Sequence, residues 1–255
     1  LDDRRILVLT TNFGTESDEL TKPIAALREA GATVTVAATE PGVVKTLAGD
    51  RDPGPEVPVD TTYDQVKAAD FDALVLPGGT LNGDQLRADE TVQQVTRAFA
   101  ADAKPVAAIC HAPWLLVDAG LAAGRDLTSV PTIRADLVNA GANWTDQEVV
   151  VDEAGGYRLI TSRTPDDLDA FNAAIIDDGV AKADVPVIWE LGRIMLVISL
   201  GNIIALVAAN FFAARSAMRV GKDLRSRVFG RVNSFSPREL AEFGTARSEE
   251  HTSEL

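Results

Sequence analysis

A cysteine and a histidine stand side by side at the end of an apolar segment. Cys110 is the only cysteine among 255 residues, and His111 is one of two histidines, the other being His251. A thiol attacks as the thiolate, which needs a group that takes its proton or lowers its pKa. An imidazole can accept that proton. The pair therefore predicts a nucleophilic site, and the alternative is a buried structural cysteine followed by a polar residue at a helix start.

The elements expected around this pair alternate between strands and helices. Short apolar runs are typical of strands covered on both faces, and they occur at 6–9, 34–38, 73–76 and 106–109. Helical periodicity covers 18–30 and 90–102, a further helix begins near 165, and 148–152 with 157–161 predicts a hairpin. The Gly-, Pro- and Asp-rich residues 49–58 predict a loop or a hairpin excursion.

This alternation predicts an α/β fold with a parallel sheet and helices on both faces. Ligands of such sheets bind at the carboxyl ends of the strands, which is where Cys110 follows the run ending at Ile109. A turn from strand to helix also presents free N–H groups that favour an anion. The same arrangement carries the nucleophile of the hydrolase elbow.

The composition excludes several classes of function. A net charge of −14 argues against nucleic acid as a partner, because binding phosphates needs Lys and Arg. One cysteine allows neither an intramolecular disulfide nor a cysteine-rich zinc site, and it suits a reducing compartment. We find no phosphate-binding loop and no His-Glu zinc helix, so we expect no metal and no cofactor. We also expect no signal peptide, and a cytoplasmic location for residues 1–176.

Several ordered motifs within residues 4–176 resemble the PfpI family, which contains cysteine peptidases and protein deglycases of the glutamine-amidotransferase-like superfamily. The segments that carry the resemblance are Asp18–Pro23, Leu76–Gly79, Ala108–Trp114, Thr132–Ala142 and Leu159–Arg163. The resemblance implies a flavodoxin-like sheet with Cys110 on the nucleophile elbow.

The resemblance also implies roles for individual residues. Glu19 matches the glutamate that hydrogen-bonds the cysteine, whereas the residue alone could be a solvated acid at a helix start. Gly79 matches the glycine whose N–H forms an oxyanion hole together with that of His111, and the simpler explanation is turn chemistry. Where many relatives carry an aromatic residue, this chain has Val130, which puts the substrate contacts there in doubt.

The activity implied is that of a cysteine-dependent hydrolase with Cys110 as nucleophile and His111 as proton carrier. Its substrates would be peptides, or glycated or aldehyde-modified adducts of proteins or small molecules. The alternative is a non-catalytic stress-response redox sensor or chaperone, in which Cys110 is oxidised to a sulfinate that Glu19 stabilises. The resemblance further implies a homo-oligomer, because relatives build their sites near subunit contacts.

The C-terminal part of the chain has a different character. Residues 1–180 carry a net charge of −16, from 14 Lys and Arg against 30 Asp and Glu, whereas 181–255 carry +2, from 10 against 8. The run 194–214 has 21 residues without a charge, enough to span a bilayer, although a buried helix of a soluble protein is the alternative. The basic residues that follow it predict a cytoplasmic C-terminal side.

Two further resemblances concern this part. Residues 175–246 resemble a fragment of an ABC-transporter permease, without the nucleotide-binding domain that transport requires, so a role as a transporter subunit is the weakest alternative. Residues 247–255 resemble one reading frame of a sequencing adapter. We therefore predict three parts, 1–176, 177–246 and 247–255, and we hypothesise that the chain is a chimera joined near 172–178. The competing hypothesis is a genuine membrane-tethered enzyme.

Overall fold

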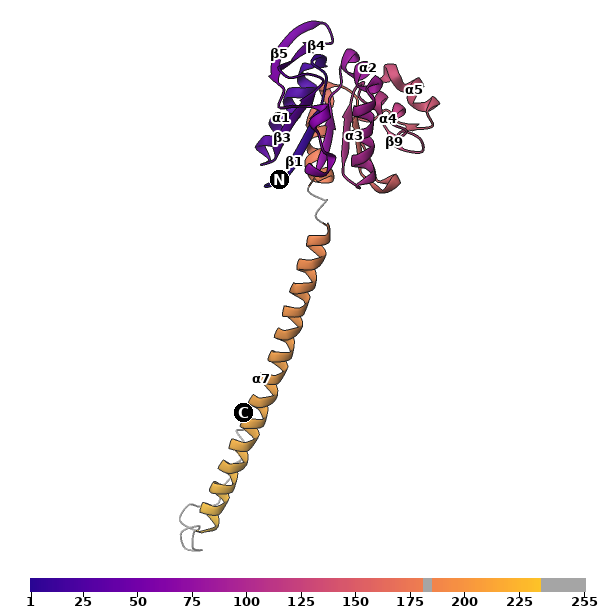
Figure 1. The fold of residues 1–255 in the computed structure, drawn as a ribbon. Coiled ribbons are helices and arrows are strands. Elements are labelled where there is room, and N and C mark those ends of the chain that lie inside the picture. Colours follow the sequence, from indigo (N-terminus) through magenta and orange to yellow (C-terminus); the bar gives the residue numbers. More distant parts are fainter. Residues whose placement is uncertain (181–184, 235–255) are drawn as a thin grey trace, which may run out of the picture. The chain divides into compact units, whose positions relative to one another are not determined.

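The computed structural model describes residues 1–180 and 185–234 (Figure 1). The chain divides into two compact units, Leu1–Val185 and Pro186–Leu255. The predicted boundaries at 176 and 246 stay predictions, and the second of them lies outside the described residues.

A seven-stranded sheet forms the centre of the first unit, in the order β11-β12-β8-β7-β1-β3-β6. Its strands are β1 (Arg5–Leu9), β3 (Thr33–Ala38), β6 (Thr61–Thr62), β7 (Ala73–Leu76), β8 (Val106–Ile109), β11 (Val149–Asp152) and β12 (Leu159–Ser162). Every neighbouring pair is parallel except β11 and β12, which form the predicted antiparallel hairpin at one edge. The predicted parallel sheet is confirmed.

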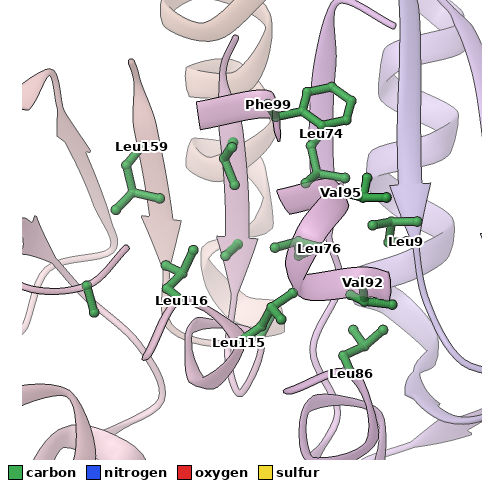
Figure 2. Close-up of a cluster of buried hydrophobic side chains, with 14 of the residues drawn as sticks. Leu9, Leu74, Leu76, Leu86, Val92, Val95, Phe99, Leu115, Leu116 and Leu159 are labelled. Carbon is green, nitrogen blue, oxygen red and sulfur yellow. The ribbon is translucent and has the colours of Figure 1, made fainter. Parts of the chain in front are cut away.

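Helices cover both faces of this sheet, as predicted. Side chains alternate between the faces of a strand, so Ile6 and Val8 of β1 join one core cluster while Leu7 and Leu9 join the other. On the first face pack α1 (Ser17–Glu29) and α6 (Leu168–Ala174), and on the second pack α2 (Thr80–Ala88), α3 (Glu90–Ala101), α4 (Pro113–Asp118) and α5 (Arg134–Asn139). Figure 2 shows ten labelled side chains of the second cluster, with Phe99 of α3 beside Leu74 of β7.

Two smaller sheets complete the first unit. One has the order β2-β4-β5, from β2 (Phe13–Glu16), β4 (Val43–Ala48) and β5 (Asp52–Pro58), so the residues around 49–58 form a hairpin excursion. The other pairs β9 (Asp126–Leu127) with β10 (Asn143–Trp144). Short helical turns occupy Tyr63–Gln65, Ala68–Asp70, Pro131–Ile133, Ala154–Gly156 and Pro165–Asp167, and a π-helical segment follows α6 at Ile175–Val180.

The second unit contains one long helix, α7 (Val185–Asn233). The long apolar helix is therefore confirmed, although it extends on both sides of the predicted span 194–214. By length and composition alone, its part Arg193–Asn233 could cross a membrane, with a mean hydropathy of 2.2 in its most apolar window. No residue of that window is buried in the structure, and the helix is a candidate membrane span, with the core helix of a soluble protein as the alternative.

Candidate active site

Cys110 lies on a sharp turn between β8 and α4. Its φ angle is +61°, a left-handed conformation that costs a non-glycine residue on the order of 1–3 kcal/mol. The turn is held on both sides, because the Cys110 N–H donates to the Ser162 carbonyl and the Cys110 carbonyl accepts from the Val130 N–H, each at 3.1 Å. This strand–turn–helix geometry is that of a nucleophile elbow, and the side chain it presents is 7% exposed.

Glu19 reaches the elbow from the first turn of α1 and is only 1% exposed. Its burial rules out the alternative of a solvated acid at a helix start. Neither carboxyl oxygen has a partner in full hydrogen-bond geometry among the described residues, and the Cys110 thiol and the Gly78 backbone are groups that face it. Burial raises the pKa of Glu19 well above its usual range, and the interaction with the thiol offsets this only in part. Glu19 is therefore a neutral acid that can donate a hydrogen bond.

The thiol of Cys110 is also held in its neutral form. Burial is the main cause that raises its pKa, and the negative charge of Glu19 would raise the pKa further whenever that carboxyl is ionised. The backbone N–H of Gly79 acts in the opposite direction. We expected the start of a helix to lower this pKa, but α4 has only six residues, and burial outweighs any such effect. A neutral thiol needs a base.

His111 lies where such a base would be needed. Its Nδ1 lies 3.2 Å from the Sγ of Cys110. Burial lowers the pKa of His111, and the charge of Asp50 raises it in part. The ring is consequently neutral at neutral pH, and a neutral imidazole can accept a proton. The structure thus brings Cys110, His111 and Glu19 together, as the sequence predicts.

Gly79 follows β7 and lies next to the thiol. Its φ angle is +96°, and a Cβ atom there would lie 2.5 Å from the Gly14 carbonyl oxygen and 2.6 Å from the Glu16 nitrogen. Glycine is therefore required both by conformation and by space. Its backbone N–H lowers the pKa of the Cys110 thiol in part, and its role as an oxyanion donor stays a prediction. The contribution of the His111 N–H to an oxyanion hole stays a prediction.

Asn82 holds the turn that carries Gly79, and no motif or periodicity in the sequence indicates this role. Its side chain is fully buried, and its amide nitrogen donates to the carbonyls of Pro77 at 2.8 Å and Gly78 at 3.1 Å. Its amide oxygen accepts from the N–H and the hydroxyl of Thr11, at 2.8 and 2.9 Å. The two residues before Gly79 are therefore held by a fully buried amide.

Three further polar residues near His111 were also missed. The hydroxyl oxygens of Thr80 and Thr132 each lie 3.4 Å from Nε2 of His111. The carboxylate of Asp50, in the turn between β4 and β5, accepts hydrogen bonds from Thr80. The only sequence signal was the composition of residues 49–58, which predicts a turn but not what that turn contacts.

Trp114 also contacts His111, through its ring. The two ring centroids are 5.3 Å apart, and the indole N–H donates to Asp136 at 2.7 Å. The guanidinium of Arg87 lies 5.3 Å from the Trp114 ring centroid and pairs with Asp118 at 2.7 Å. Val130 is half-buried and packs against both core clusters, so an aliphatic side chain occupies the place where an aromatic residue was expected. In the part of the chain that the structure describes, no group of three or more His, Cys, Asp or Glu residues could hold a metal ion.

Comparison with known proteins agrees with this geometry. Residues 4–178 match the DJ-1/PfpI family. The chain belongs to that family. The DJ-1/PfpI relatives in Bacillus subtilis include General stress protein 18, 49% identical over 166 residues (65% of this chain and 91% of the relative), and the putative cysteine protease YraA, 45% identical over 169 residues (66% and 94%). Protein/nucleic acid deglycase 2 of Escherichia coli is 46% identical over 169 residues (66% and 94%).

A solved DJ-1/PfpI structure shows the same fold. DJ-1beta of Drosophila melanogaster superposes with a TM-score of 0.62 at 33% identity, covering 77% of this chain and 98% of that protein. The flavodoxin-like architecture predicted from the sequence is thereby confirmed. The DJ-1/PfpI match ends at residue 178, so nothing in it concerns α7.

Proposed function

We propose that the first unit is a cysteine-dependent hydrolase of the deglycase or peptidase type, with Cys110 as its nucleophile. The observation that carries this proposal is the 3.2 Å approach of the Cys110 sulfur to a neutral imidazole nitrogen of His111, on an elbow backed by the buried Glu19. The names of relatives, deglycase and putative cysteine protease, support the reaction class. The proposed substrates are peptides and glycated or aldehyde-modified adducts of proteins or small molecules.

The proposed reaction begins with proton transfer from the thiol of Cys110 to Nδ1 of His111. With a peptide as substrate, the sulfur then forms a bond to the carbonyl carbon of the amide, and the carbonyl π electrons move onto the oxygen, which the Gly79 N–H stabilises. Collapse of this adduct expels the amine, which takes the proton from His111. A water molecule, deprotonated by His111, then cleaves the acyl–sulfur bond and restores the thiol. Glu19, as a neutral acid, donates a hydrogen bond to the sulfur whenever it carries negative charge.

The test is turnover by the full chain in detergent solution. Substrates are a methylglyoxal-modified peptide and an unmodified peptide, and the released products are identified by mass spectrometry. Cys110→Ala should abolish turnover, while Asn143→Ala, an exposed change remote from the thiol, should not. Turnover that survives in Cys110→Ala would overturn the proposal.

A second candidate function is redox sensing, for which the contact between Glu19 and Cys110 is also suited. Hydrogen peroxide would transfer one oxygen atom to the sulfur in each of two steps, leaving as water each time, and the protonated Glu19 could donate to a sulfinate oxygen. The name of General stress protein 18 fits a stress role. No turnover of any substrate, together with a stable mass gain of two oxygen atoms at Cys110 that Glu19→Ala abolishes, would favour this function.

For the second unit we retain the two hypotheses drawn from the sequence. In one, α7 anchors a genuine fusion protein in a membrane, and the basic residues after the apolar run then place the C-terminal side in the cytoplasm and the first unit on the opposite side. In the other, residues after about 175 are foreign sequence joined to the enzyme. A homo-oligomer of the first unit is likewise a proposal, which sedimentation of the full chain in detergent would test.

A further inference from the structure

The carboxylate of Asp50 contacts a neighbour of the catalytic histidine. Its Oδ1 accepts the backbone N–H of Thr80 at 3.0 Å, and its Oδ2 accepts the Thr80 hydroxyl at 2.8 Å. The same hydroxyl oxygen lies 3.4 Å from Nε2 of His111. A chain of polar contacts thus runs from Asp50 through Thr80 and His111 to the sulfur of Cys110.

Asp50 is exposed, but hydrogen bonds to its backbone hold it in place. The backbone N–H groups of Gly49 and Asp50 donate to the two carboxyl oxygens of the buried Glu16, at 3.2 and 3.0 Å. Asp50 also adopts a φ angle of +56°, which is unfavourable for a residue other than glycine. Such a conformation persists where surrounding contacts impose it, and here Glu16 and Thr80 do so.

The direction of the hydrogen bonds follows from the chemistry of each group. A carboxylate only accepts, so the Thr80 hydroxyl hydrogen points at Asp50, and the Thr80 oxygen can only accept from His111. The hydrogen on the ring must therefore lie on Nε2. That leaves Nδ1 with its lone pair, facing the thiol of Cys110. The hydroxyl of Thr132 can donate or accept and accommodates either form of the ring.

We propose that Asp50 is a positioning residue that, acting through the Thr80 hydroxyl, holds His111 in the tautomer with its hydrogen on Nε2. The inference rests on the proposed role of His111 as the base for Cys110. Nδ1 is the nitrogen next to the sulfur, so only this tautomer can take the thiol proton. The hydrogen bond at one ring nitrogen decides the state of the other. The charge of Asp50 additionally raises the pKa of His111 against the effect of burial.

A purely structural role for Asp50 makes a different prediction. Thr80 is the first residue of α2, and Gly79 before it has no side chain that could cap the helix, so Asp50 could serve only as a cap. Asp50→Asn separates the two roles. The amide oxygen can still accept the Thr80 N–H, but the amide nitrogen donates to the Thr80 hydroxyl. The hydroxyl hydrogen then turns to Nε2 of His111, and the ring hydrogen moves to Nδ1.

The first experiment observes the ring nitrogens of His111 directly. The full chain in detergent, with ¹⁵N-labelled histidine and His251→Gln to leave one histidine, gives ¹⁵N shifts that distinguish a protonated from an unprotonated nitrogen. The parent should carry hydrogen on Nε2, and Asp50→Asn should move it to Nδ1. Thr80→Val should abolish the preference, and Thr80→Ser, which keeps the hydroxyl, should retain it. Asp52→Asn, an exposed acid two residues away, is the matched control and should change nothing.

The second experiment measures the alkylation rate of the single cysteine by iodoacetamide as a function of pH. Asp50→Asn should slow alkylation at neutral pH about tenfold or more, because the base is lost, whereas Asp52→Asn should stay within about twofold. The proposal would be overturned if Asp50→Asn changed neither the ¹⁵N shifts of His111 nor the pH profile of the alkylation rate. Asp50 would then be only a helix cap, even if the variant had a lower melting temperature.

Turnover measured in parallel keeps this inference distinct from the proposed function. If no variant turns over any substrate but Asp50→Asn still moves the ring hydrogen, the tautomer assignment stands and the hydrolase proposal fails. If Cys110→Ala abolishes turnover while Asp50→Asn leaves both turnover and the ring unchanged, the hydrolase proposal stands and the inference is overturned.

Discussion

Glu19 and Cys110 lie on either side of Gly78, and the missing side chain of this glycine is what lets them meet. A Cβ atom on Gly78 would lie 2.6 Å from Cβ of Cys110 and closer still to the carboxyl oxygen Oε2 of Glu19. Residue 78 must therefore be a glycine, because there is no room for a side chain at this position. It keeps a neutral acid within reach of the sulfur.

Gly78→Ala should force Glu19 or the elbow to move. The cost of such overpacking is about 1–3 kcal/mol in the free energy of unfolding, measured by denaturant titration of the full chain in detergent. The alkylation rate of Cys110 should change as well, because the acid and the thiol separate. A variant with wild-type stability and a wild-type alkylation rate would show that the contact is not as close as described.

Glu19→Gln should alter how stability depends on pH. The pKa of Glu19 is raised on folding, so above its usual value of 4.5 the folded chain keeps a proton that the unfolded chain releases. The free energy of unfolding that the protonated Glu19 contributes is therefore lost as the pH rises toward the pKa of Glu19 in the folded chain. Between about pH 5 and 8, below the titration of the thiol, the parent should lose stability with rising pH and Glu19→Gln should lose less. Parallel curves would contradict the burial of a neutral acid.

Asn82→Ala should loosen the turn before Gly79. It leaves the buried carbonyl of Pro77 without its donor, which costs about 1–3 kcal/mol, whereas the carbonyl of Gly78 keeps the backbone N–H of Glu16. Asn82→Asp should cost more, because a carboxylate would face those same carbonyls. The exposed Asn143 provides the control, and Asn143→Ala should stay within about 0.5 kcal/mol. Equal denaturation midpoints for the two alanine variants would remove Asn82 from the support of the site.

The hypothesis of a chimeric chain makes a prediction at the level of DNA. Sequencing reads from an independent library of the source should break between codons 165 and 185, with separate continuations on each side. Continuous coverage through that interval would establish the fusion and overturn the chimera hypothesis. The match to the DJ-1/PfpI family ends at residue 178, inside the interval that these reads must cross.

The sheet could be predicted because its central strands are buried on both faces. Such strands must be apolar at every position, and β7 and β8 are short continuous apolar runs for that reason. The place of Cys110 followed, because the residue after a buried parallel strand lies at the ligand-binding edge. Local pattern was sufficient for this position, although the groups that hold the turn, Ser162 and Val130, are distant in the sequence.

The contacts made by Asp50 and Asn82 could not be predicted in the same way. Asp50 meets Thr80, which is thirty residues away, and Asn82 meets Thr11, which is seventy-one residues away. Each pair joins a residue of a turn or loop to a residue at the start of α2, and no periodicity in the sequence records that these two segments meet. The protonation of Glu19 was also beyond the sequence, because it depends on how completely the folded chain excludes water from one carboxyl group.

The parts of this site differ in how freely evolution can exchange them. Cys110 directly follows β8, Gly78 follows β7 by two residues, and Glu19 lies near the start of α1. An insertion at any of these places would displace the central sheet. Asp50 is carried instead on the turn of the β4–β5 hairpin, which the seven-stranded sheet does not include. A lineage can lengthen, shorten or replace that turn without disturbing the nucleophile. Relatives that share the elbow are therefore expected to diverge in how they orient its histidine, and through that in the pH at which each one works.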